Sequence, residues 1–504
     1  MGAIVLTGLT PDWALPNNYV QVNFAAGPSS GADISYPALL IGNKTSAGSA
    51  TADTVIYGPR SQVPLLTETD AIALFGTGSE LHLMWLEFTK VNKSTAVSAI
   101  AVAESAGVNA SATITWTSAA TAAGVTTVWV DDEFVQASFA SGDSVTTIAT
   151  AVKNAINAKT KWPVTATNSS GVLTITCRNK GPRGNWHRFS ATIDAGVGTS
   201  VDSGTPAYFT GGTTADDNTA ALATISPSRF YWNASAADDA TQFKALCDQL
   251  TTNGLPLTGI RERAFAGYNG TQANCITITT AVNNARAEMI HLEKGDVPPF
   301  RMAARLAAIA ALYEVKPRPR HNFDGFGNQA SENSIWTVPA PRSGTVPSPT
   351  YLNTSLNSGI TPVGVNPGTG TTYIVKRCTT RFLNGSNADY RIRDPHKVSV
   401  CDFFADDWKA KLDTQFAGKD LADDPKQGQH VPGPDVATPN GIRGALFGLI
   451  DEYAENDQLQ NVDAIKAGVV VQRSTTNTNR AETRTPLQPI SILDSTANAI
   501  DQIA

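Results

Sequence analysis

Apolar and polar residues follow different periods in successive stretches of the chain, and these changes predict several domains. Residues 34–104 and 216–316 alternate between buried-strand and helix patterns, which is typical of α/β structure. Residues 105–215 instead carry short alternating strand patterns separated by Gly, Asn and Ser turns. We therefore predict a mixed α and β, multidomain fold, in which a β-rich domain (105–215) is inserted into a discontinuous α/β domain (34–104 plus 216–316).

Helix and strand patterns can be placed within these segments. Helices are expected at 238–251 and Pro299–Tyr313, and one helix at Val145–Ala158 should interrupt the insert. Strands are expected at 229–232 and 276–280, among other positions.

The last third of the chain begins with a linker rich in Pro, Gly and Asn (317–350), followed by a C-terminal domain with a C-terminal arm (351–504). Strands are expected there at 373–377, 390–393 and 469–473, with an extended tail at 487–493. Helices are expected at 398–416 and 443–455, the second of them amphipathic.

Residues 1–33 read as an N-terminal arm. Val20, Val22 and Phe24 alternate with polar residues, as in a half-buried strand, while Pro16 precedes the segment and Gly27 follows it. A single strand isolated in this way is not stable, so it must pair with another sheet. We predict that it joins a neighbouring subunit; pairing with the C-terminal sheet of its own chain is the alternative.

Composition narrows the function. Charged residues make up 16 % of the chain, against about 25 % in a typical protein, and the net charge is −6. Without a long basic run, direct nucleic-acid binding is not expected. No apolar run approaches the ~20 residues that span a bilayer, so membrane insertion is not expected either. Five widely spaced cysteines without a CxxC motif predict reduced thiols.

Candidate catalytic motifs fail in their context. The GxSxG pattern at 27–31 contains Pro28 and is not followed by a helix pattern, and Gly76 with Gly78 is better explained as a helix C-terminus. The six histidines lack metal-ligand spacing. The acidic pairs Asp406-Asp407 and Asp423-Asp424 are expected on the solvated surface. We therefore expect no catalytic, cofactor-binding or metal-binding residues.

The order of several sequence stretches resembles the tail sheath proteins of Mu-like contractile-tailed bacteriophages. The likeness is weak in each segment but spans most of the chain. Residues 494–504 depart from it, because they are polar and Ala-rich where an apolar closing strand is expected. The stretches are LPNNYVQVNF (15–24), YPALLIG (36–42), DAIALFGTGSEL (70–81), ATIT (112–115), VLTITCRNKGPRGN (172–185), IKAGVVVQR (465–473) and NTNR (477–480).

This resemblance implies a structural subunit that polymerises into a helical sheath around a tail tube and contracts, driving the tube through the host envelope. The implied partners are other copies of the chain, the tail tube protein, and the baseplate and tail terminator proteins. The implied location is the virion, after assembly in the host cytoplasm. Extended arms would add strands to a neighbour's sheet, and the insert would face outward.

Two groups of residues are candidates for these contacts. Acidic residues on the polar face of the 443–455 helix are candidates for contacting the tube: Asp451, Glu452 and Glu455. Arm and terminal-strand residues are candidates for the subunit interface: Tyr19, Val20, Gln21, Val22, Asn23, Phe24, Val469, Val470, Val471, Ile490, Ile492 and Leu493.

Two other classes of protein fit the composition less well. A β-rich surface adhesin or lattice-forming protein would be expected to carry a signal peptide, whereas the sequence opens without a basic segment and reaches Pro11 early. An enzyme with a β-rich insert would be expected to show a nucleophile or acid pair in the α/β halves, and none is visible.

Overall fold

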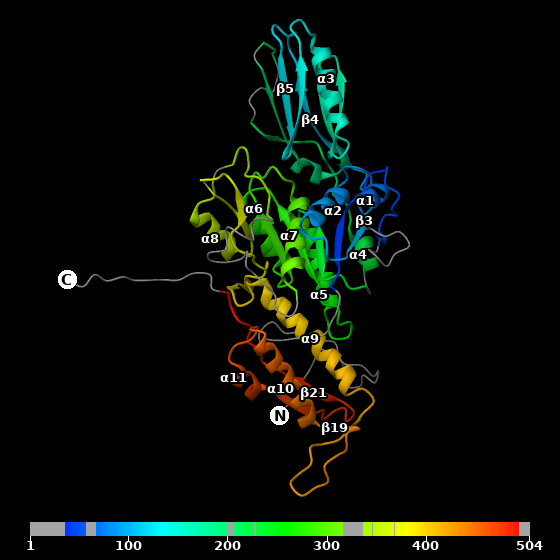
Figure 1. Cartoon of the computed structure of the whole chain (residues 1–504), viewed down its shortest axis with the longest axis vertical. Helices are drawn as coiled ribbons and strands as arrows, with labels where there is room; N and C mark the ends of the chain where they lie inside the picture. The colour runs from blue at the N-terminus through cyan, green and yellow to red at the C-terminus, as the bar shows by residue number, and fades with distance from the viewer. Residues whose placement is uncertain are drawn as a thin grey trace, which may run out of the picture.

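The computed structural model describes residues 36–56, 67–194, 196–198, 205–225, 228–315, 336–344, 346–366 and 368–492. Within these ranges the chain forms three parts stacked along its long axis (Figure 1). The insert lies at one end, an α/β body in the middle, and a helical C-terminal part at the other end. The mixed, multidomain fold predicted from the sequence is confirmed.

The body is built on one eight-stranded sheet in the order β15-β14-β13-β12-β11-β1-β3-β2. Neighbouring strands from β14 to β3 run parallel, while β15 and β2 are antiparallel edge strands. The body's elements are β1 (Ala38–Asn43), β2 (Val55–Ile56), α1 (Glu68–Phe75), α2 (Glu80–Val91), β3 (Val97–Val102), α4 (Thr219–Ile225), β11 (Trp232–Ser235), α5 (Ala240–Asn253), β12 (Arg263–Tyr268), α6 (Gln272–Val282), β13 (Ala287–His291), α7 (Pro299–Tyr313), α8 (Pro349–Asn357), β14 (Thr361–Val365), β15 (Thr372–Ile374), β16 (Leu383–Asn384) and β17 (Asn387–Ala388).

Helices cover both faces of this sheet, which is why its central strands are buried at every position. In β1, Ala38 and Leu40 pack with α1, α2 and α7 in one core, whereas Leu39 and Ile41 pack with α4, α5 and α6 in a second. The Ala-rich α7 is buried along nearly its whole length. The body is therefore a doubly wound three-layer α/β structure.

The insert leaves the body after β3 and returns before α4. It folds around its own apolar core as two antiparallel sheets, β10-β9-β5-β6 and β4-β8-β7, and α3 packs against β6 and β7. Its elements are β4 (Asn109–Thr115), β5 (Gly124–Val130), β6 (Glu133–Phe139), α3 (Val145–Ala158), β7 (Val164–Ser169), β8 (Val172–Lys180), the 3-10 helix η1 (Pro182–Trp186), β9 (Arg188–Ile193) and β10 (Ala207–Tyr208). The helix expected at Val145–Ala158 is confirmed.

The long helix α9 joins the body to the C-terminal part. It contributes Phe403 to the core of the body and Phe404 and Trp408 to the C-terminal core, so it belongs to both. The elements of this part are α9 (Pro395–Gln415), β18 (Asp420–Leu421), β19 (Val436–Ala437), α10 (Pro439–Glu455), α11 (Val462–Gly468), β20 (Val470–Arg473) and β21 (Ala481–Arg484).

Two of the expected strands are wrong. Residues 276–280 alternate like a strand but lie inside α6, because Cys275, Ile278 and Val282 form a buried stripe at helical spacing and Thr271 caps the helix start. Residues 390–393 form a turn, in which the Asp389 carboxylate accepts hydrogen bonds from the Arg391 backbone and guanidinium. The strand expected at 229–232 begins only at Trp232.

The pairing of strands in the sheet places the boundary between the body and the C-terminal part later in the chain than residue 350. Strands β14 and β15 fall in the segment expected as the C-terminal domain (351–504), yet they pair with β13 and extend the sheet of the body. Helix α8 crosses the expected boundary at residue 350. We propose that the C-terminal part begins at α9, where the chain leaves the body.

Candidate functional site

The expected subunit-interface residues are only partly within the described ranges. Residues 19–24 and Leu493 lie outside them. Val469 and Val471 are buried against α10, and Val470 is half-buried in the hairpin that β20 forms with β21. Ile490 and Ile492 are half-buried. The valines therefore anchor the hairpin to its own module, and in the described chain this hairpin is a two-stranded sheet.

Ile490 lies in a segment that the same chain already holds. The Ile490 backbone N–H donates to the Gln458 carbonyl at 3.0 Å, and the Ile490 carbonyl lies 3.0 Å from Nε2 of His396 in α9. The Gln460 N–H donates to the Gln488 carbonyl. Residues 488–490 thus run beside 458–460, and this part of the terminal segment is fixed within its own chain.

The acidic residues expected to contact the tube lie along α10 and are already partly neutralised. Asp451 forms an ion pair with Lys466 of α11 at 2.5 Å, and Glu452 forms one with Lys411 of α9 at 3.1 Å. Glu455 is exposed. The two pairs are largely solvated, so they contribute little to stability and leave the carboxylates accessible.

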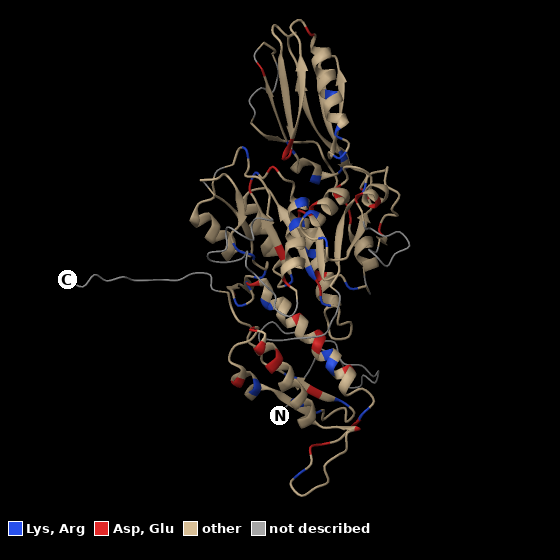
Figure 2. Cartoon of the chain, viewed as in Figure 1, with Lys and Arg blue, Asp and Glu red and all other residues tan. Residues whose placement is uncertain are grey.

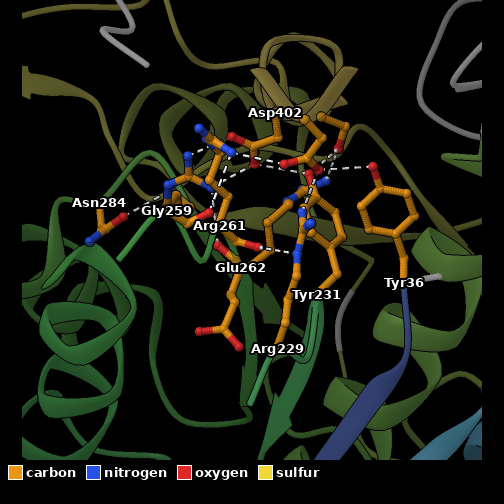
Figure 3. Close-up of polar contacts among 12 residues, drawn as sticks. Tyr36, Arg229, Tyr231, Gly259, Arg261, Glu262, Asn284 and Asp402 are labelled. Carbon is orange, nitrogen blue, oxygen red and sulfur yellow. Dashed lines mark hydrogen bonds and ion pairs between the residues drawn. The ribbon is translucent and has the colours of Figure 1, made fainter. Parts of the chain in front are cut away.

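The most extensive polar cluster of the described chain lies where α9 crosses the amino ends of the parallel strands, a region we call the amino-edge junction (Figure 3). Tyr36 precedes β1, Tyr231 precedes β11, Arg261 precedes β12 and Arg286 precedes β13. Because neighbouring parallel strands start at the same edge, these side chains converge on one surface of α9.

Two carboxylates one helical turn apart on α9 receive these groups. Asp402 accepts two hydrogen bonds of 2.6 Å from the Arg286 guanidinium and one of 3.0 Å from the Tyr231 hydroxyl. Asp406 binds Arg229 at 2.6 Å and Arg261 at 2.8 Å, and the Tyr36 hydroxyl donates to it at 3.0 Å. Burial lowers the pKa of Arg286, but Asp402 outweighs that effect and raises it.

The expectation that Asp406 and Asp407 are solvated is wrong. Asp406 is 5 % exposed and Asp407 is fully buried, where it accepts a hydrogen bond from the Tyr453 hydroxyl at 3.0 Å. The packing of α9 explains this, because Phe403 lies in the core of the body while Val400, Phe404 and Trp408 lie in the C-terminal core, so the first half of the helix is buried between the two.

Beside the junction lies a closed ring of four fully buried charges. Arg263 of β12 and Arg377 each pair with both Glu288 of β13 and Glu314 at the end of α7. The Ser399 hydroxyl of α9 donates to Glu314 at 2.6 Å and accepts from Arg263 at 2.8 Å. Two positive and two negative charges balance within the ring, which is how such a group can exist without solvent.

Glu262 is the exception in this region, since its carboxylate is fully buried and bound by neutral donors. It accepts hydrogen bonds from the Phe230 N–H at 2.8 Å and the Asn253 side-chain amide at 3.1 Å. Burial raises the pKa of Glu262 to about 7. Between the pKa of an ordinary glutamate and this value, the folded chain keeps a proton that the unfolded chain releases.

We predict that Glu262→Gln flattens part of the pH dependence of stability. For the native chain, the contribution of Glu262 is fully present below about pH 4.5 and is lost as the pH rises through about 7, at about 1.4 kcal/mol per unit and about 3 kcal/mol at most. Urea unfolding of both proteins from pH 4.5 to 8 measures the difference. Exposed Glu455→Gln is the control, and equal slopes for native chain and Glu262→Gln would contradict the prediction.

The opposite, carboxyl edge of the sheet is where open α/β sheets usually bind ligands, and here residues of the insert pack on the carboxyl ends of β1 and β12. The cavity between insert and body has a volume of about 10 Å³, enough for roughly one water molecule. Its lining includes Glu80, Cys177 and His187. Among the described residues, no group of His, Cys, Asp or Glu side chains is placed to hold a metal ion.

Two further features bear on the chemistry available. The five cysteines are buried and free, and burial raises the pKa of the Cys401 thiol to about 12. No helix in the described ranges is both long and apolar enough to pass through a membrane.

The amino-edge junction could not be predicted from sequence spacing. Its arginines and tyrosines are scattered from residue 36 to residue 286, and no spacing links them. One local signal was present, since Asp402 and Asp406 stand at helical spacing among large apolar residues that predict burial on all sides of α9.

Comparison with known proteins gives one similar curated sequence. The chain is 22% identical over 472 residues to the Mu-like prophage FluMu tail sheath protein of Haemophilus influenzae, covering 92% of this chain and 92% of that protein. No known family model matches the chain.

Two solved structures are similar to the chain at low sequence identity. A sheath tail protein of Listeria innocua has a TM-score of 0.47 at 10% identity, covering 92% of this chain and 94% of that one. A sheath tail protein of Desulfitobacterium hafniense has a TM-score of 0.43 at 12% identity, covering 94% and 100%. The sequence similarity, which extends over nearly the whole of both chains, confirms the resemblance of this protein to the tail sheath proteins of Mu-like phages.

Proposed function

We propose that this chain is a phage tail sheath subunit, a structural protein of the virion that polymerises into a helical sheath around a tail tube and contracts to drive the tube through the host envelope. The observation that carries the proposal is the similarity to a tail sheath protein over 92% of both chains. The buried carboxyl edge of the sheet supports a structural role over a catalytic one, because an enzyme needs room for its substrate.

The proposed partners are those that this role requires. Copies of the chain would contact one another through heterologous interfaces that form an open helix. The tube protein would lie inside, and the baseplate and tail terminator proteins would bound the two ends. Assembly would take place in the host cytoplasm. Electron microscopy of the purified protein tests the proposal directly: tubes or rings are expected, and particles that remain discrete monomers at every concentration and salt condition would refute it.

We propose that residues 19–24 add a strand to a neighbouring subunit, with Val469–471 and the terminal segment 490–493 near the acceptor. The β20–β21 hairpin supports this, because in the described chain it is a sheet of two strands, and a small antiparallel sheet can be extended by a further strand. Each added backbone hydrogen bond is worth about 0.5–1.5 kcal/mol net, so a single link is modest and repetition along the helix gives strength.

We predict that Val22→Pro gives a folded monomer that cannot form tubes, because proline removes a ladder donor and is excluded from a paired strand. Circular dichroism checks the fold, and sedimentation with electron microscopy measures assembly. Val22→Thr keeps the β-branched shape and the N–H group, and should assemble. Outright misfolding of Val22→Pro, with normal Val22→Thr, would show that the strand belongs to its own core.

We predict that Asp451→Lys with Glu452→Lys weakens cosedimentation of the sheath with tail tubes but leaves tube-free polymers unchanged. The two intramolecular ion pairs that the change breaks are exposed and worth about 0–1 kcal/mol each, so the fold should survive. Asp413→Lys, on the exposed side of α9, is the matched control. Unchanged cosedimentation would remove α10 as a tube contact.

A further inference from the structure

The body has a topological switch point between β1 and β11. From β1 the chain proceeds through α1 and α2 to β3 on one side, and from β11 it proceeds through α5 to β12 on the other. In doubly wound sheets the crevice outside the carboxyl ends of two such strands is the usual ligand site. Asn43 ends β1 at this point, Glu80 begins α2 above it, and Asp238 follows β11.

The occupant of this crevice is a side chain of the insert. Arg183, from the 3-10 helix η1, is 6 % exposed and binds Asn43 at the carboxyl end of β1. Its Nε and Nη2 atoms donate to the Glu80 carboxylate at 2.9 and 3.0 Å, and Nη2 also donates to Asp216 at 2.6 Å and to the Asn43 side-chain oxygen. Two carboxylates and an amide thus surround one guanidinium.

Backbone N–H groups at the end of β1 and in the connection to the insert position the acceptors. The Glu80 carboxylate accepts a hydrogen bond from the Asn43 backbone N–H at 3.0 Å, and the Asp216 carboxylate accepts one from the Ser105 N–H at 2.7 Å. Both acidic side chains are at most 5 % exposed. The site therefore holds two buried negative charges. The two Glu80 carboxylate oxygens accept from two nitrogens of one guanidinium, an arrangement that an ammonium group cannot reproduce.

Neighbouring contacts hold the insert at the same place. Asn179 of β8 accepts a hydrogen bond from the Glu80 N–H at 3.0 Å, and the Trp186 indole N–H donates to Asp238. Arg188 of β9 pairs with Asp296 of the body at 3.1 Å, and Arg301 of α7 pairs with Asp132 of the insert at 2.6 Å. Charged side chains are sparse over the outer part of the insert and gather at its contact with the body (Figure 2).

We propose that the switch-point crevice is a guanidinium-binding site and that Arg183 is its resident ligand, which fixes the insert on the body in one orientation. The insert folds around its own core, but the positive charge of its Arg183 neutralises the buried carboxylates of Glu80 and Asp216. The insert and the α/β body consequently behave as one unit, and deletion of residues 105–215 would remove the guanidinium that Glu80 and Asp216 bind.

The test uses chemical rescue of the full-length chain. Arg183→Ala should lower the unfolding midpoint by at least about 5 °C, since it leaves two unpaired buried carboxylates. It should also accelerate hydrogen exchange of the Asn43 and Ser105 amides by at least about tenfold, because their acceptors lose the guanidinium. Millimolar guanidinium chloride, far below its denaturing range, should restore both readouts in a saturable way.

Two controls make the outcome decisive. Arg178→Ala, on the same insert, loses only hydrogen bonds to the Trp162 and Thr160 carbonyls of the insert and should gain nothing from guanidinium. Sodium chloride at equal ionic strength should not rescue Arg183→Ala. Arg183→Lys, which keeps the charge but not the fork, should show an intermediate midpoint that guanidinium does not raise.

Should Arg183→Ala prove insoluble, the yield of refolded protein with guanidinium over that with sodium is measured instead, and a gain of at least about tenfold supports the proposal because it exceeds nonspecific salt effects. A stable Arg183→Ala variant, or recovery with sodium equal to that with guanidinium, overturns it.

Discussion

Glu288→Gln should destabilise the folded chain by about 3–5 kcal/mol, since it removes one charge from the buried ring and leaves the guanidinium groups of Arg263 and Arg377 sharing a single carboxylate. All four members of the ring are fully buried, so water cannot compensate. A loss of this size is a large part of the 5–15 kcal/mol that stabilises a typical domain. Urea unfolding of the native chain and the variant measures this loss, provided that the unfolding free energy of both depends equally steeply on urea concentration.

A second variant separates charge imbalance from loss of packing. Replacing all four residues together (Arg263→Met, Glu288→Leu, Glu314→Leu and Arg377→Met) removes every charge while keeping volume, and should cost far less than the single change, or even stabilise the chain. If Glu288→Gln costs under about 1 kcal/mol, the ring does not behave as a closed ionic unit. If the fourfold variant is as unstable as the single one, packing and not charge balance governs this region.

Asp402→Asn should loosen α9 from the body, with a loss of about 3 kcal/mol in unfolding free energy. The substitution keeps the shape of the side chain but removes the charge that both Arg286 hydrogen bonds and the Tyr231 hydroxyl depend on. Because α9 carries the C-terminal core, hydrogen exchange should accelerate first along residues 395–408 and then in α10.

The matched control lies on the same helix. Asp413 pairs with Lys409 one turn away at 2.6 Å, but both side chains are more than 40 % exposed. Asp413→Asn should therefore cost at most about 0.5 kcal/mol. Similar losses for the two variants would show that the amino-edge junction is not what attaches α9 to the sheet.

Local sequence patterns predicted the elements whose periodicity is strong. Helices Val145–Ala158 and Pro299–Tyr313 were expected at their observed bounds, because their buried positions repeat at helical spacing over at least three turns. The pattern failed at 276–280, where alternating Ile and Thr residues suit a strand but the buried stripe suits a helix. Intrinsic preference is weak there, and packing against β13 and α5 decides.

The sequence by itself determined the mixed α and β, multidomain character of the chain and the order of segments that resembles a tail sheath protein. Only the tertiary structure decided that β14 and β15 complete the sheet, that Asp402 and Asp406 are buried, and that Arg183 fills the switch point. The reason is physical. Periodicity records which face of an element is buried, whereas these ion pairs join residues 33 to 177 positions apart, and the path of the chain alone brings them together.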